Sequence, residues 1–411
     1  MGHYVSSTSH PIATNENILK ERIESMLSTQ LDLKAKLWEV QLSCGDIGSS
    51  GAISIEKAKK RAVPLMEERE TIALFRIHHA LCDGVSASIV IAEASDEADR
   101  LSKWSESEIM KRRTQMMRVG KSVKSVFETI CKWFLFYVVG SIHAITLLFW
   151  RIMVSSNPFD EIITKDGGLR HERGVAWRPV APLIEMKHVA KSVSPSATLN
   201  DLTVSMVAYA IERQLQEHVD QDRINSCDFK RGFNIVIPVH LTGGVFRPGD
   251  QLGNKIGAFV TNIPTKSKRT TSSRQRLLTI SKCLKEGRSS PAPFIAWNLA
   301  KFFSNYTPDW CSQYVMKKGN AKSVAVVSNV RGFPFQVHWL GHKIEQICAF
   351  LPLPSGIPIG VLVHSYDGEV SFSVHAEKRA VPDTERFIDL MIEEYKRIKM
   401  IENLDEKAHL E

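Results

Sequence analysis

The stretch Thr71–Gly84 reads TIALFRIHHALCDG and joins an apolar run to two adjacent histidines and an Asp-Gly pair. The β-branched and aromatic residues of Thr71–Ile77 predict a strand. Because successive side chains of a strand point to opposite faces, His78 and His79 are expected to face in different directions. We expect Asp83-Gly84 to turn the chain, since glycine adopts backbone angles that other residues resist. A histidine held at the end of a strand suits a general base near neutral pH.

Two other interpretations of this string have to be weighed. Strand-end histidines followed by a turn aspartate have a purely structural explanation, which the residues alone leave open beside catalysis. A metal site is the weaker alternative, because adjacent histidines on a strand diverge. The chain also contains no HExxH motif and no Cys-x-x-Cys pair that would complete a ligand set.

Length and composition indicate a globular protein. The 411 residues are enough for two domains, and 43% of them are hydrophobic and 24% charged. A net charge of +8 is compatible with nucleic acid, an anionic membrane surface or an anionic small molecule as partner. No run of basic residues interleaved with aromatic residues is present, so we expect no nucleic-acid partner. Seven scattered cysteines indicate a reducing compartment without a disulfide framework.

A basic stretch and an apolar stretch follow one another in the first half of the chain. Lys111–Lys132 is rich in lysine and arginine, and Trp133–Trp150 holds 18 residues without Asp, Glu, Lys or Arg. This apolar stretch admits a buried core helix, a helix lying in a membrane surface or a membrane span. The preceding basic residues and the terminal tryptophans favour the helix that lies in the surface.

The spacing of apolar residues predicts further helices and strands. Helical spacing is found in Asn17–Leu31, Val85–Leu101, Leu199–Val219, Lys266–Arg288 and Thr384–Ile401. Strand patterns are found in Leu37–Leu42, Asn234–Leu241, Ile256–Val260, Ile359–Tyr366 and Glu369–Ala376. Asp367-Gly368 between the last two strands is a strong hairpin signal. Asn200 or Asp201 is expected to cap the helix from Leu199. The irregular stretch Ser155–Pro182 is taken as a linker.

The HHxxxDG string of His78–Gly84 is the signature of the CoA-dependent acyltransferase superfamily. From about residue 30 to about residue 400, the chain resembles the wax ester synthase/diacylglycerol acyltransferase family of that superfamily. The remaining stretches of the resemblance occur in family order: Leu31–Leu42, Asn200-Asp201, Pro238-Val239, Gly253-Asn254, Asn262-Ile263-Pro264, Ser328-Asn329-Val330 with Gly332, Ser365-Tyr366-Asp367-Gly368 and Val381-Pro382-Asp383.

The resemblance implies an α/β (α+β) fold of two chloramphenicol-acetyltransferase-like lobes. Each lobe would be a mixed sheet flanked by helices, with the active-site tunnel between them. We expect a first lobe over residues 1–154, which includes the motif and a membrane-docking segment at 133–150. A linker over 155–182 and a second lobe over 183–411 would follow. The family has a further strand and helix ahead of the first residues here, so the first lobe is expected to be short.

The resemblance also implies the reaction. A fatty acyl group would pass from acyl-CoA to a long-chain alcohol or a diacylglycerol, giving wax ester or triacylglycerol without a further cofactor. His79 would be the general base and His78 would support it. Asp83 would shape the loop by pairing with a nearby base, and Gly84 would keep the tunnel open.

Four more residues are candidates on the same resemblance. Asn329 and Ser328 are expected on a turn after the apolar run Val324–Val327, where they would stabilise an oxyanion. Asn200 and Asp201 are expected to cap a helix near the tunnel.

The chain is then expected to be associated with a membrane, facing the cytosol, at the endoplasmic reticulum, the plasma membrane or a lipid droplet. A condensation domain that forms amides from carrier-bound acyl groups is an alternative on the same fold. An inactive or lipid-binding relative with an incomplete first lobe is another. The sequence leaves the preferred acceptor, the acyl chain length and the oligomeric state open.

Overall fold

The structure, a computed structural model, describes most of the chain in eleven stretches. The described residues are 16–29, 31, 37–44, 71–120, 135–142, 145–146, 157, 159, 172–218, 232–264 and 272–408. The chain divides into two compact units, Met1–Cys82 and Asp83–Glu411.

The first unit contains a helix and an antiparallel pair of strands. Helix α1 (Glu16–Ser28) precedes strands β1 (Trp38–Cys44) and β2 (Thr71–Ile77), whose register runs from Trp38↔Ile77 to Cys44↔Thr71. Side chains join these elements: Arg22 Nε donates to Gln41 Oε1 at 2.8 Å. The predicted strand Thr71–Ile77 is confirmed residue for residue.

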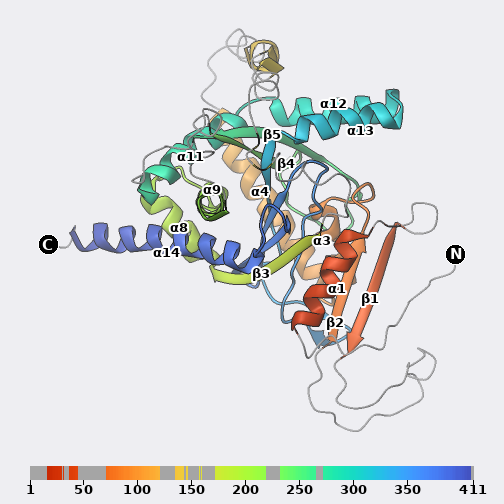
Figure 1. Ribbon diagram of the computed structural model, residues 1–411. Helices are drawn as coiled ribbons and strands as arrows, with labels where there is room; N and C mark the ends of the chain where they lie inside the picture. Colours follow the sequence, from red (N-terminus) through yellow and green to blue (C-terminus); the bar gives the residue numbers. More distant parts are fainter. Residues whose placement is uncertain are drawn as a thin grey trace, which may run out of the picture. The chain divides into compact units, whose positions relative to one another are not determined.

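The second unit is built on a six-stranded mixed sheet of order β3-β10-β9-β6-β4-β5 (Figure 1). The strands are β3 (Arg173–Pro182), β4 (Phe233–His240), β5 (Ile256–Ile263), β6 (Ser323–Val330), β9 (Ile359–Tyr366) and β10 (Glu369–Glu377). Strands β4, β6 and β9 are parallel, and the other pairs are antiparallel. The carboxyl ends of the three parallel strands therefore lie at one edge of the sheet. A separate short pair is formed by β7 (His338–Trp339) and β8 (His342–Lys343).

The second unit also contains helices. They are α3 (Gly84–Ala94), α4 (Ala98–Gly120), the π-helix η1 (Leu135–Val139), α8 (Leu183–Val193), α9 (Leu199–His218), α11 (Ser273–Arg288), α12 (Ala292–Tyr306), α13 (Asp309–Asn320) and α14 (Thr384–Ala408). Figure 1 shows α8, α9, α11 and α14 gathered on one side of the sheet. Their apolar side chains form one continuous core with Ile235, Val361 and Phe372 of the strands.

The opposite face of the sheet has its own, smaller core. Ile89 and Ala92 of α3 pack with Phe246, Phe333 and Tyr366. The alternation of β9 explains the division, because Val361 and Val363 belong to the large core and Tyr366 belongs to the small one.

The hairpin signal at Asp367-Gly368 is confirmed. Strands β9 and β10 pair from Tyr366↔Glu369 onward, and the two turn residues have φ of 48° and 82°. A two-residue turn with both φ positive matches the right-handed twist of the flanking strands. Asp383 caps α14, since its Oδ1 accepts from Arg386 N at 3.0 Å.

Two expectations need comment. The predicted helix Val85–Leu101 is wrong as one element, because α3 ends at Ala94 and α4 begins at Ala98. Ser95 between them is extended, and its hydroxyl donates to Ala92 O at 2.8 Å, so it ends the first helix.

The last residues of the predicted linker form β3, and the division into lobes stays a prediction.

The membrane segment predicted at 133–150 lies largely outside the described residues. Within it, residues 135–142 and 145–146 are helical. Among the helices that the structure describes, none is both long enough and apolar enough to cross a membrane.

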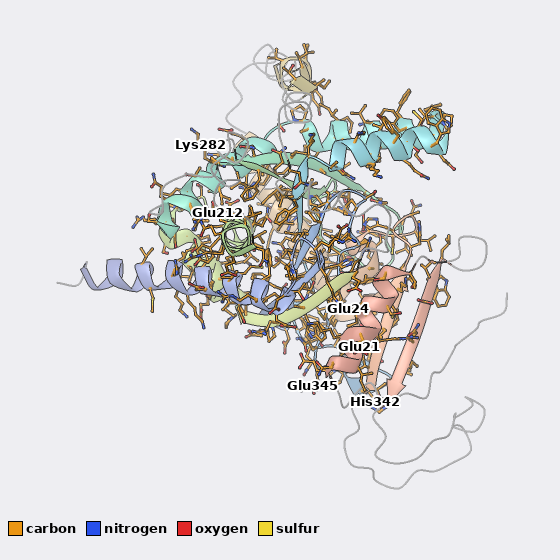
Figure 2. The ribbon with its side chains drawn as sticks, in the orientation of Figure 1. Glu21, Glu24, Glu212, Lys282, His342 and Glu345 are labelled. Atoms are coloured by element: carbon orange, nitrogen blue, oxygen red, sulfur yellow. The ribbon has the colours of Figure 1, made fainter. Side chains whose placement is uncertain are left out.

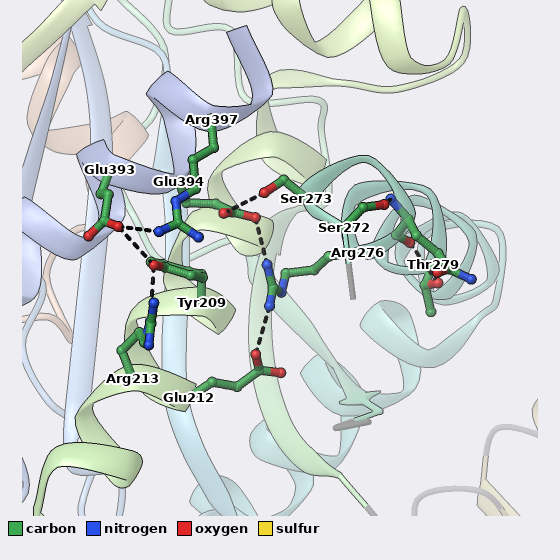
Figure 3. A network of polar contacts seen from close by, with 11 residues as sticks. Tyr209, Glu212, Arg213, Ser272, Ser273, Arg276, Thr279, Glu393, Glu394 and Arg397 are labelled. Carbon is green, nitrogen blue, oxygen red and sulfur yellow. Dashed lines mark hydrogen bonds and ion pairs between the residues drawn. The ribbon is translucent and has the colours of Figure 1, made fainter. Parts of the chain in front are cut away.

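A buried ionic network joins α9, α11 and α14 (Figure 3). Arg276 donates to Glu212 at 2.8 Å and to Glu394 at 2.7 Å, and Glu394 also accepts from Ser273 at 2.8 Å. Burial raises the pKa of both glutamates, while Arg276 lowers it. Figure 2 shows Glu212 toward the packed interior and Lys282 of α11 toward the outside.

We predict that Arg276→Met lowers the free energy of unfolding by about 3 kcal/mol, since the buried Glu394 and the half-buried Glu212 lose their common cation. Urea unfolding at neutral pH measures this. The matched control is Arg386→Met, which removes a more exposed pair with Glu217 between the same helices α14 and α9 and should cost less than about 1 kcal/mol. Equal losses in the two variants would contradict a structural role for the buried network.

Candidate active site

His78 and His79 follow β2 directly, in the turn that leaves the strand. His78 N donates to Leu37 O at 2.8 Å, and its Nδ1 accepts from Ala80 N at 3.2 Å. An Nδ1 that accepts carries no proton in the neutral ring, so the proton of His78 lies on Nε2. The side chain of His78 is therefore tied to its own turn. His79 is half-buried in the same turn.

Asp83 begins the helix that follows the two histidines. Its Oδ1 accepts from Ser86 N at 2.8 Å and its carbonyl from Ala87 N at 2.8 Å, which makes it the N-cap of α3. The expected turn at Asp83-Gly84 is thus the first turn of a helix. A carboxylate at this position also faces the positive end of the helix dipole.

The second carboxylate oxygen of Asp83 binds residues far along the chain. Asp83 Oδ2 accepts from Lys255 N at 2.9 Å and lies 3.4 Å from His240 Nε2. Asp83 N donates to Gly253 O at 3.1 Å. His240 comes from the carboxyl end of β4, and its Nδ1 accepts from Gly244 N at 3.3 Å. In the neutral ring the proton of His240 is then on Nε2, which faces Asp83.

These contacts fix the charge of Asp83. Its side chain has no exposed surface, and burial by itself would raise its pKa. Hydrogen bonds from His240 and from the backbone of Lys255 and Ser86 outweigh the burial and hold the pKa of Asp83 well below its usual range. Asp83 is therefore ionised at neutral pH and is unsuited to transfer protons. Asp83 thus lies beside His240, a residue that sequence reasoning did not single out.

Gly84 lets α3 start against the end of β6. A Cβ at Gly84 would lie 2.8 Å from Val330 Cγ2, closer than carbon atoms normally approach. Packing thus explains why this residue is a glycine, because a side chain here would push the start of α3 away from the end of β6.

The expected turn at Ser328-Asn329 is wrong, because both residues lie inside β6. They pair in parallel with Leu362 and Val363 of β9, and this long-range pairing extends the strand to Val330. Ser328 and Val330 share one face of the strand, the face that touches Gly84. Asn329 points to the opposite face and is exposed.

The backbone at Gly332 passes very close to the end of β9. A Cβ on Gly332 would lie 1.6 Å from Ser365 O and 3.2 Å from His364 Cδ2, so no other residue fits here. His364 is buried, and burial lowers its pKa to about 4. Its Nε2 has no hydrogen-bond partner among the described residues. Sequence reasoning missed His364, because its position inside a strand pattern gave no signal.

The predicted caps Asn200 and Asp201 are corrected to Thr198. Asp201 Oδ2 accepts from Thr198 N at 2.9 Å, and Thr198 Oγ1 accepts from Asp201 N at 3.3 Å, a capping box with an aspartate in the acid position. Asp201 is fully buried and also accepts from Arg288 at 2.8 Å and Ser281 at 3.1 Å. Asp201 therefore holds α9 to α11.

No metal centre emerges from the described part of the chain, where no three His, Cys, Asp or Glu side chains are grouped suitably for an ion. The residues that converge at the sheet edge are instead Asp83, Gly84, His240 and the Gly253–Lys255 turn, with the end of β6 beside them.

We predict that Asp83→Asn lowers the free energy of unfolding by about 1–3 kcal/mol, because an amide oxygen cannot satisfy both backbone donors. Chemical denaturation measures this across pH. The depressed pKa stabilises the fold above the unfolded value of 3.8, and this contribution is lost as the pH falls below that value. The gap between wild type and variant should be constant from neutral pH to about pH 5 and shrink below about pH 4.

Asp250→Asn is the matched control for this variant. Asp250 lies in the same loop region and forms an exposed pair with Arg247 at 2.6 Å. It should change the stability by less than about 0.5 kcal/mol. If Asp83→Asn also changed the free energy of unfolding by less than about 0.5 kcal/mol at neutral pH, the anchoring role of the carboxylate would be contradicted.

Comparisons with known proteins agree with this architecture. Residues 252–399 match the family model described as the WS/DGAT C-terminal domain. The solved structure of wax ester synthase/diacylglycerol acyltransferase from Marinobacter aquaeolei VT8 is similar with a TM-score of 0.53 and 16% identity, over 97% of this chain and 79% of that chain. The SgcC5 protein from Streptomyces globisporus is less similar, with a TM-score of 0.46 and 13% identity, over 95% of this chain and 81% of that chain. No curated protein matches the sequence of the chain.

The expected fold class is confirmed as a mixed α/β fold in which helices flank a mixed sheet. The structural likeness supports the fold alone. Residues 252–399 are similar to the C-terminal domain of the wax ester synthase/diacylglycerol acyltransferase family, the same family that the sequence motifs resemble.

Proposed function

We propose that the chain is an O-acyltransferase that moves a fatty acyl group from acyl-CoA to a long-chain alcohol or a diacylglycerol. The WS/DGAT C-terminal domain supports acyl transfer in general. The donor, the acceptors and the catalytic residues are the finer part of the proposal. Acyl-CoA enters as a substrate, and the proposed reaction requires no further cofactor.

The observation that carries the proposal is the division of roles within the motif. Asp83 is buried, ionised and bound by two backbone amides, so its role is to hold the chain in place. His78 is bound to its own turn through Nδ1. The resemblance assigns the proton transfer to His79, the second histidine of the motif.

The mechanism then has two steps with His79 as the general base. First, His79 takes the proton of the acceptor hydroxyl while the oxygen attacks the thioester carbonyl, which gives a tetrahedral oxyanion. The oxyanion next collapses, the carbon–sulfur bond breaks, and the CoA thiolate receives the proton from the imidazolium. The products are the ester and free CoA, and no acyl-enzyme forms.

Ser328 is the stronger of the two oxyanion candidates. It shares a strand face with Val330, whose side chain meets Gly84 at the start of α3. Asn329 faces the other way, toward the side of the large core. A hydroxyl placed beside a developing oxyanion lowers the barrier because it is already oriented when the charge forms.

Both acceptor classes are poorly soluble in water, and we propose that the enzyme works at the cytosolic side of a membrane or a lipid droplet.

We predict that His79→Ala lowers ester formation by about 10²–10⁴-fold, the usual contribution of a positioned base. Radiolabelled palmitoyl-CoA is supplied with hexadecanol or a diacylglycerol, and labelled ester is separated and counted. His342→Ala, which changes an exposed histidine on β8, is the matched control and should keep full activity. Ester formation retained in His79→Ala would overturn its role as base. The absence of ester with both acceptors in wild type would overturn the proposed reaction.

We predict that Ser328→Ala lowers kcat by about 10²-fold and leaves KM nearly unchanged, because the hydroxyl would act only in the transition state. Asn329→Ala should lower kcat less than about threefold, since its side chain lies on the opposite face. Steady-state kinetics with the preferred acceptor gives kcat for both variants and shows which of the two residues stabilises the oxyanion. A larger kcat loss in the asparagine variant would reverse the assignment.

A further inference from the structure

Helices α12 and α13 form an unusually exposed pair at the β5 edge of the sheet (Figure 1). Pro293 is the only buried residue of α12, and α13 has no buried residue. The start of α12 is anchored, because the carbonyl oxygen of Pro293 would lie 2.0 Å from a Cβ at Gly257 of β5. Beyond this anchor, both helices present their side chains outward.

Large apolar side chains dominate this pair. Those exposed on the two helices are Phe294, Leu299, Phe302, Tyr306, Trp310, Tyr314, Val315 and Met316. On α12, the exposed aromatic residues Phe294, Phe302 and Tyr306 fall on one face at helical spacing. Helices of this length gain little stability in water by themselves, so such a face is expected to be covered in use.

An apolar groove continues the surface beside α12. It has a volume of about 490 Å³, and its walls include Tyr137, Phe294, Leu299 and Phe302. Residues 137–142 on the far wall also expose large apolar side chains, with Ile142 at 62%. The apolar surface thus extends from α13 across α12 to this short helical segment.

The charges on the pair are almost all positive. Lys301 lies with its ammonium 4.4 Å from the ring centre of Trp297, and Lys318 lies 5.8 Å from that of Tyr314. Lys317 is exposed beside Lys318, and Asp309 is the one acidic residue of the two helices. Amphipathic aromatic rings next to lysines are typical of surfaces at the boundary between lipid and water.

We propose that α12 and α13 dock the protein on an anionic phospholipid bilayer, with the exposed aromatic side chains in the interfacial layer. Charge complementarity favours an anionic bilayer over a second copy of the chain on this surface. In a symmetric dimer through the same surface, both copies would bring the same excess of positive charge to the interface, which is unfavourable. A bilayer with anionic headgroups attracts them and also receives the apolar face. This docking surface does not depend on the acyl-transfer chemistry proposed above, and through the groove it adjoins residues 137–142 of the apolar segment expected at 133–150.

The test is co-sedimentation of the full-length chain with phosphatidylcholine vesicles, with and without phosphatidylserine. Phe302 and Trp310 are 52% and 72% exposed, so Phe302→Ser with Trp310→Ser should leave the fold intact. We expect this double variant to bind both kinds of vesicle at least about tenfold more weakly. The double variant Lys317→Glu with Lys318→Glu should bind the vesicles that contain phosphatidylserine about tenfold more weakly than the wild type does. Its binding to pure phosphatidylcholine vesicles should be unchanged.

Ile184→Ser is the matched control, because Ile184 is 83% exposed on α8, away from the pair. It should bind vesicles like the wild type, and thermal unfolding should give the same midpoint for all variants. Unchanged vesicle binding in the aromatic double variant would overturn the proposal. So would a dimer in light scattering that the aromatic variant abolishes while vesicle binding persists, since the surface would then join two copies.

Discussion

The carboxylate of Asp83 is the constraint on which the sheet edge depends. A charge without exposed surface is costly unless hydrogen bonds replace its lost water. Ser86 N satisfies one oxygen, and Lys255 N and His240 satisfy the other. These partners come from α3, from the turn before β5 and from the end of β4, so a single charge brings three separate segments together. Asp83 of the motif thus acts as a structural anchor.

The same anchor fixes what the neighbouring residues can be. With α3 held at its first turn, its backbone passes so close to β6 that Gly84 has no room for a side chain beside Val330. Gly332 is restricted in the same way by the carbonyl of Ser365. The glycines are therefore explained by close neighbours, the side chain of Val330 at Gly84 and the backbone of Ser365 at Gly332, without any need for conformational freedom at positive φ.

Patterns that depend on near neighbours were predicted well from the sequence. Strand β2 and the β9–β10 hairpin follow from alternation and from Asp367-Gly368, and α9 follows from its apolar spacing. The scaffold role of Asp83 was also expected, although only through the family resemblance. The strand, the hairpin and the helix share one property, which is that the residues that determine them lie within a few positions of each other.

Features that depend on distant partners were missed. His240 had no signal beyond ending an apolar strand, and its contact with Asp83 exists only once the sheet has formed. Ser328 and Asn329 were expected on a turn, because nothing local shows that β9 pairs with them. Thr198 was overlooked as a cap in favour of the polar residues after it. The helices α12 and α13 were not foreseen, since their exposed aromatic residues resemble core residues in the sequence.

The electrostatics of the sheet edge explain why the motif needs two kinds of residue. Between about pH 5 and 8 neither Asp83 nor His364 changes its charge, because one pKa is held far below this range and the other is about 4. Groups that keep a constant charge preserve a fixed geometry, yet they cannot carry protons at neutral pH. The proton acceptor must therefore be another group, and the proposed base, His79, lies in the half-buried turn before Asp83. Burial keeps the charge of the anchor constant, and the short motif thus spans a fully buried and a half-buried environment.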